Sequence, residues 1–170
     1  MKNEKFILTE TAIVVKGITL YQIKALKNFG NIRKNELGGF IEKETNLCSL
    51  NNCWVSEHGK VSGNAVISGN AVIRWCAEVS GDAVISGNAV VAGNAEVSEY
   101  AEITGNAELG GNAVINDHAK VCGNAQIKWA ATISGNAVIT DDAVISGNAV
   151  ITDNAQVSGT AQVSGDAVII

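Results

Sequence analysis

A six-residue repeat fills about two thirds of the chain and leaves few folds open to it. From Val61 to Val168 there are 18 consecutive hexads, each with Val, Ile or Leu at its first position and Ala at its fifth. Alternate side chains of an extended segment share a face, so each Ala points inward with the aliphatic residue two positions later. Most third and fourth positions are Gly-Asn or Gly-Asp. Because Gly and Asn adopt left-handed backbone conformations readily, each hexad is predicted to be a short strand ending in a tight corner.

Strands this short bury too little to be stable alone, so the hexads must stack on one another. Three hexads make a triangular coil of 18 residues, and about six coils spaced ~4.8 Å apart give a rod roughly 30 Å long. Residues 18 apart are then vertical neighbours. The sequence therefore predicts an all-β protein in which residues 55–170 form a single-stranded parallel β-helix. Residues 1–54, with β-rich stretches between Phe6 and Leu26, are expected to form a small cap and a segment leading into the first coil.

Length and charge narrow the possible functions. A chain of 170 residues is too short for a multidomain enzyme. Residues 1–54 hold eight basic and five acidic side chains (+3), whereas residues 55–170 hold four basic and twelve acidic ones (−8). Phosphate binding needs clustered basic side chains, so we expect no direct nucleic-acid binding by the rod. We find no signal peptide, membrane span or metal-type cysteine spacing, and expect a cytoplasmic chain with free thiols and no bound metal.

The repeat resembles the hexapeptide-repeat family of parallel β-helices, whose members wind with a left hand. A more specific resemblance lies in the segment Gly30 to Val55, where Leu37-Gly38-Gly39-Phe40-Ile41-Glu42 is followed by Asn46-Leu47 and then by Cys53-Trp54-Val55. This segment is similar to the one that leads into the solenoid in the YdcK-like group. Proteins of that group occur in bacteria and phages and carry the label of acyltransferases.

The departures from the repeat are the candidate functional positions. At the 18-residue period, Glu99 and Tyr100 lie above Asp117 and His118 at one corner, where three of the six coils have glycine followed by Asn or Asp. Glu102 lies above Lys120 beside them. This group contains a possible base, carboxylates that would stabilise an imidazolium and a phenol that can donate a hydrogen bond. It is either a site, with these six residues in binding or catalytic roles, or a set of exposed corner residues with a local charge pair.

A second corner carries two tryptophans. Trp75 and Trp129 lie three coils apart, or ~14 Å at the spacing between paired strands. Exposed tryptophan is enriched at binding hot spots, so this pair is expected either to anchor a partner or to cover the backbone of its own coils. Cys76 falls below His58 at the same corner. A Cys-His pair can form an activated thiolate, but no third group that would orient it is evident.

We therefore expect first a rigid, oligomeric β-solenoid that acts as a binding or scaffolding module without a cofactor. Its expected partners are further copies of the chain, as a trimer or end to end through the rung at residues 168–170, and an unidentified protein. The occurrence of the group suggests an interaction protein or inhibitor of phage type. The family resemblance implies an alternative, an acyltransferase that moves an acyl group from a coenzyme A thioester to a hydroxyl or amine with His118 as general base. Those enzymes usually interrupt the repeat with a loop over the acceptor, whereas this repeat is uninterrupted.

Overall fold

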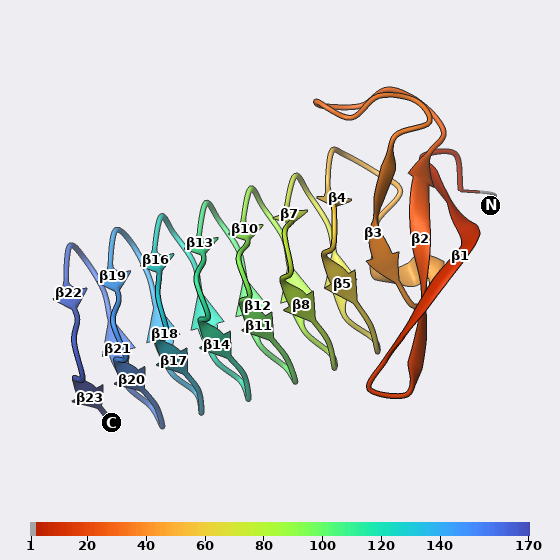
Figure 1. The fold of residues 1–170 in the computed structure, drawn as a ribbon. Helices are drawn as coiled ribbons and strands as arrows, with labels where there is room; N and C mark the ends of the chain where they lie inside the picture. The colour runs from red at the N-terminus through yellow and green to blue at the C-terminus, as the bar shows by residue number, and fades with distance from the viewer. Residues whose placement is uncertain (1–2) are drawn as a thin grey trace.

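The computed structural model describes residues 3–170, and most of them form a parallel β-solenoid (Figure 1). Its coils lie side by side along one axis, with the N-terminal hairpin at one end. Strands 18 residues apart pair in register, as Val66 does with Val84 and Val90 with Glu108. The predicted all-β fold and the 18-residue coil are confirmed. The left-handed winding stays a prediction from the family resemblance.

Three sheets form the sides of the solenoid. The six-stranded face contains β6 (Val66–Ile67), β9 (Val84–Ile85), β12 (Glu102–Ile103), β15 (Lys120–Val121), β18 (Val138–Ile139) and β21 (Gln156–Val157). The seven-stranded face contains β4 (Trp54–Val55), β7 (Val72–Ile73), β10 (Val90–Val91), β13 (Glu108–Leu109), β16 (Gln126–Ile127), β19 (Val144–Ile145) and β22 (Gln162–Val163). The ten-stranded face contains β1 (Phe6–Val15), β2 (Ile18–Ala25), β3 (Leu37–Ile41), β5 (Lys60–Val61), β8 (Glu78–Val79), β11 (Glu96–Val97), β14 (Val114–Ile115), β17 (Thr132–Ile133), β20 (Val150–Ile151) and β23 (Val168–Ile169).

The interior consists of the two residue types that define the repeat. The second residue of most two-residue strands and the alanine of most hexads are fully buried, as Ile85 and Ala83 are. At the corners, side-chain amides of adjacent coils form a ladder in which Asn70 donates to Asn88 and Asn88 to Asn106, each at 2.9 Å. The ladder continues through Asn124 to Asp142. Stacked amides of this kind add to the backbone pairing between coils and make the rod rigid.

The cap continues one sheet of the solenoid. β1 and β2 form an antiparallel hairpin, β2 pairs with β3, and β3 pairs in parallel with β5. A short 3-10 helix, η1 (Glu44–Asn46), closes the top of the six-stranded face. There the buried Asn46 amide donates to the carbonyls of Gly63 and Ala65 at 3.1 and 2.9 Å. These carbonyls would otherwise be open at the edge of the sheet, so Asn46 satisfies groups that the first coil leaves unpaired.

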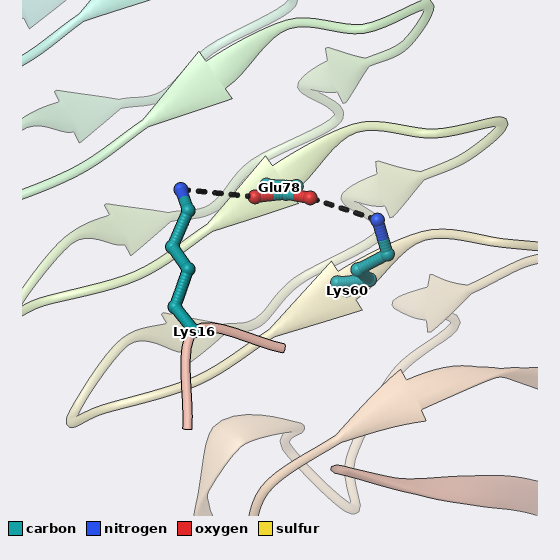
Figure 2. Close-up of polar contacts among 3 residues, drawn as sticks. All are labelled: Lys16, Lys60 and Glu78. Carbon is teal, nitrogen blue, oxygen red and sulfur yellow. Dashed lines mark hydrogen bonds and ion pairs between the residues drawn. The ribbon is translucent and has the colours of Figure 1, made fainter. Parts of the chain in front are cut away.

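The hairpin turn also contacts the outer surface of the rod. Lys16, in the turn between β1 and β2, places its Nζ 3.4 Å from an Oε of Glu78 (Figure 2). The other Oε of Glu78 accepts a hydrogen bond from Lys60 at 2.7 Å. Burial tends to raise the pKa of Glu78, but Lys60 and then Lys16 outweigh it and leave that pKa below its usual range. The contact therefore fastens the hairpin to the second coil.

Candidate functional site

The corner between the ten-stranded and six-stranded faces, called here the histidine corner, holds Glu99, Tyr100, Asp117 and His118. The rings of Tyr100 and His118 are stacked, with centroids 4.9 Å apart and planes 10° from parallel. Both side chains are exposed. The predicted vertical alignment of these two residues is confirmed.

Backbone geometry at this corner explains what the acidic residues do. Glu99 and Asp117 occupy the glycine position of their hexads with φ of 58° and 55°. The Oδ2 of Asp117 accepts a hydrogen bond from the N–H of Gly135 in the next coil at 2.9 Å. This bond, followed by Glu99 and by the charge of His118, holds the pKa of Asp117 below its usual range. Asp117 thus links two coils, and the oxygen that makes this link is engaged with backbone rather than with the imidazole.

Beside the histidine corner, Glu102 and Lys120 form the predicted stacked pair on the six-stranded face. The Nζ of Lys120 lies 3.2 Å from an Oε of Glu102, and both side chains are about half exposed. None of the hollows described below is lined by a residue of this corner. The structure therefore brings the six predicted residues together on the outer surface, outside these hollows.

The two tryptophans lie three coils apart along a different corner, between the seven-stranded and ten-stranded faces. We call the corner positions Trp75, Gly93, Gly111 and Trp129 the tryptophan edge. The side chains of Trp75 and Trp129 are 49% and 70% exposed. The guanidinium of Arg74 lies 4.7 Å from the ring of Trp75, a cation–π contact. Cys76 is a free, exposed thiol, and among the hydrogen bonds of residues 3–170 none joins it to His58.

A shallow hollow of about 150 Å³ lies on the seven-stranded face beside the tryptophan edge. Ala92 and Gly110 line it between Arg74 and Lys128, with Glu108 in the same lining. The sequence interpretation missed both cations. A signal was present, because Arg74 and Lys128 each directly precede one of the two corner tryptophans, 54 residues apart. That distance is three coils, so the two pairs face the same way.

A larger hollow of about 490 Å³ lies where residues 30–32 cross the start of the seven-stranded face. Trp54, Glu57 and Arg74 are among its lining residues. The indole N–H of Trp54 is buried and has no hydrogen-bond partner among residues 3–170, and the Phe29 ring packs against this indole with centroids 5.3 Å apart and planes at 69°. The contact with Phe29 accounts for the position of Trp54, which seals the cap against the rod.

The cap also contains a buried cation that the sequence interpretation missed. The Nζ of Lys5 donates to the carbonyls of Cys53, Cys48 and Leu50 at 2.7, 3.1 and 3.4 Å, and lies 3.2 Å from the Cys53 sulfur. Burial raises the pKa of the Cys53 thiol, an effect that Lys5 only partly opposes. Cys53 is fully buried, and the position of Lys5 gives this cluster a structural role.

Comparisons with known proteins agree with the fold. Residues 145–159 match the family model described as YdcK Beta solenoid repeat. Over 59 residues, 34% of this chain, the sequence is 39% identical to a protein named "Uncharacterized acetyltransferase YdcK" of Escherichia coli (strain K12). The match spans only 18% of the length of that protein. No helix among the described residues is long and apolar enough to cross a membrane. The resemblance to the YdcK-like group is thus confirmed, with the family model matching residues 145–159 of the β-solenoid, whereas the similarity drawn from Gly30 to Val55 stays a prediction.

Proposed function

We propose that the protein is a rigid binding module that engages a partner protein along the tryptophan edge. The observation that supports this proposal is the conformation of Trp75 and Trp129. Both adopt left-handed backbone angles, with φ of 58° and 62°, at hexad positions that are usually glycine. A bulky residue in that region costs on the order of 1–3 kcal/mol, and residues held at such a cost cluster at functional sites.

Two of the other residues that replace glycine at the corners gain a contact between coils. Asp117 and Asp141 each accept a hydrogen bond from the backbone N–H of the coil below. Aspartate also tolerates left-handed angles better than most residues. Trp75 and Trp129 are 49% and 70% exposed and make no hydrogen bond of that kind in the described part of the chain. Among the described residues, Trp75 gains the contact with Arg74, and no aromatic or cation–π contact is found for Trp129. Binding of a partner gives a further reason for an indole at both positions.

The rod suits this role because it holds both indoles at a fixed spacing. The core residues are fully buried and the coils are joined by parallel pairing and by amide ladders. A partner would therefore meet a surface that is ordered before binding, which lowers the entropic cost of association. This fits a scaffolding protein whose partner is another copy of the chain or a different protein.

The test compares a double variant, W75A/W129A, with a control, Y100A, which removes an exposed aromatic residue at the histidine corner. Sedimentation velocity over a range of concentrations measures self-association, and co-purification from extracts of the source organism measures capture of another protein. We expect the wild type to associate in at least one assay, Y100A to match it, and the double variant to lose that association at least tenfold. Association that is equal in all three proteins, or absent in all, contradicts the proposal.

A second candidate function is acyl transfer with His118 as general base. It is supported by the name of the E. coli relative and by an exposed imidazole beside Asp117 in an otherwise regular repeat. The test is equilibrium dialysis with acetyl coenzyme A, followed by measurement of free thiol release with hydroxyl and amine acceptors. Thioester binding, with turnover that H118A abolishes while its circular dichroism spectrum is unchanged, would support this function. No binding at millimolar thioester would exclude it.

A further inference from the structure

The charges of the solenoid single out two side chains. Residues 55–170 contain four basic and twelve acidic residues. Lys60 is paired with Glu78 and Lys120 with Glu102. The other two, Arg74 and Lys128, form no salt bridge with any described residue. The unpaired cations of an acidic rod are thus the two that directly precede the tryptophans of the tryptophan edge.

Arg74 and Lys128 lie at the two ends of one surface on the seven-stranded face. Arg74 and Lys128 occupy equivalent positions three coils apart on the seven-stranded face, which is about 14 Å at the spacing of paired strands. The equivalent positions in the coils between them are Ala92 and Gly110. Ala92 is 4% exposed, and a Cβ added to Gly110 would meet no atom within 4 Å. Two cations therefore bracket a shallow floor of small, mostly apolar groups.

Each cation retains hydrogen-bonding capacity for a ligand. The Cζ of Arg74 lies 4.7 Å from the centroid of the Trp75 ring, and the guanidinium has five N–H donors with which to bind a carboxylate. The Nζ of Lys128 donates to the Oε1 of Gln126 at 2.6 Å, which uses one of its three donors. The site is therefore suited to two carboxylates, one at each end.

We propose that this surface binds an extended acidic segment of a partner protein with the pattern Glu-x-apolar-x-Glu, lying along the axis of the rod. In an extended chain, residues i, i+2 and i+4 share one face, and i and i+4 are about 13–14 Å apart. The two glutamates then reach Arg74 and Lys128, and the apolar residue lies over Ala92 and Gly110. This inference rests on the proposed binding function and names the chemistry of the partner.

Glu108 refines the pattern. It belongs to the same hollow, between the two cations, and its side chain is exposed. A third carboxylate at the centre of the ligand would meet this charge, so a central apolar residue is preferred over a central acid. The apolar floor formed by Val90, Ala92 and Gly110 favours a peptide side chain over a sugar chain covered with hydroxyl groups. Residues 1–170 contain no Glu-x-apolar-x-Glu segment, so a second copy of these residues does not supply it.

The experiment measures binding of a fluorescein-labelled peptide, GSGESLSEGSG, by anisotropy at low salt. The comparison peptides replace both glutamates by Gln, or move the second glutamate to position i+2. We expect R74Q/K128Q to weaken binding of the first peptide at least tenfold. The control K16Q/K120Q removes two cations that lie elsewhere, and it should stay within twofold of the wild type. E108Q should tighten binding a few-fold, and 0.5 M NaCl should weaken it in the wild type.

Several outcomes would overturn the inference. These are no binding at millimolar peptide, equal binding of the Gln peptide, equal binding of the i+2 peptide, or equal losses in R74Q/K128Q and K16Q/K120Q. A heparin-derived tetrasaccharide is tested as well. If it binds through Arg74 and Lys128 while the peptide does not, the ligand of this surface is a glycan and the inference is wrong. If the peptide fails but W75A/W129A still loses association, the binding module stands and only the chemistry assigned to its partner is wrong.

Discussion

The phenol ring of Tyr100 covers one face of the His118 imidazole, at a centroid distance of 4.9 Å and an angle of 10°. The stack fixes the ring of His118 without a hydrogen bond and leaves its two nitrogens at the rim. The neighbouring Asp117 uses its Oδ2 to bind the Gly135 N–H. This corner is therefore built first as a link between coils, and any chemistry at His118 would take place on an open surface.

The link through Asp117 predicts a pH-dependent contribution to stability. The pKa of Asp117 is lowered in the folded protein, so its carboxylate stabilises the fold at pH values above its usual pKa of about 4. The contribution is lost as the pH falls through the lower, folded value. We expect D117N to be less stable than the wild type at pH 7, with the difference shrinking between pH 4 and pH 2. Urea midpoints measured at each pH test this.

The matched control for that series is D153N, at the same corner. The Asp153 side chain makes no hydrogen bond to a described residue. Because D153N removes no such bond, it should cost less stability at pH 7 than D117N does. A loss of equal size in D153N would show that the bond to Gly135 is not the cause.

The strain at Trp129 predicts that glycine is tolerated there. Because the side chain is 70% exposed, its removal forfeits little burial. The left-handed conformation costs a residue with a Cβ roughly 1–2 kcal/mol, and the entropy of glycine offsets part of that gain. W129G should be at least as stable as the wild type and about 1 kcal/mol more stable than W129A, which keeps the Cβ. A loss of more than ~1 kcal/mol in W129G would mean that the indole packs against the rod.

The cluster around Lys5 predicts that the cap depends on one buried ammonium. K5M would leave the carbonyls of Cys48, Leu50 and Cys53 without this donor, at an expected cost of about 2–4 kcal/mol. Urea denaturation followed by tryptophan fluorescence reports this change, because the buried Trp54 lies next to the cap. The control K16M alters a lysine whose side chain is 74% exposed and should cost less than ~1 kcal/mol. Similar costs for the two variants would contradict the structural role of Lys5.

The contact between Glu78 and the hairpin predicts a smaller effect that depends on salt. E78Q removes the ion pairs with Lys60 and Lys16, with an expected cost of up to about 1 kcal/mol at neutral pH. The pKa of Glu78 is lowered in the fold, so the difference from the wild type should disappear as the pH falls below about 4. It should also decrease in 0.5 M NaCl. Melting temperatures at two salt concentrations and two pH values measure it, and a salt-independent difference would point to packing instead.

The sequence was sufficient for the rod and for the alignment of its irregular residues. In a solenoid with in-register parallel pairing, the remainder of a residue number after division by 18 determines the corner or strand that it occupies. Tyr100 therefore had to lie over His118, and Trp75 in line with Trp129, once the period was known. The same arithmetic held the signal for Arg74 and Lys128, but it became visible only when the salt bridges showed which cations were left unpaired.

The cap was decided by the tertiary structure, because residues before the repeat have no period that would assign them a place. The sequence predicted β-rich stretches there, but not that the hairpin would extend the ten-stranded face, or that Lys16 would reach Glu78 across 62 positions. Lys5 likewise appears as an ordinary basic residue near the N-terminus, and only folding brings the carbonyls of Cys48 and Cys53 around it. In a periodic segment, the sequence spacing alone determines which residues are neighbours. In an aperiodic segment such as the cap, the neighbours depend on which surfaces of the folded chain are free to pack against it.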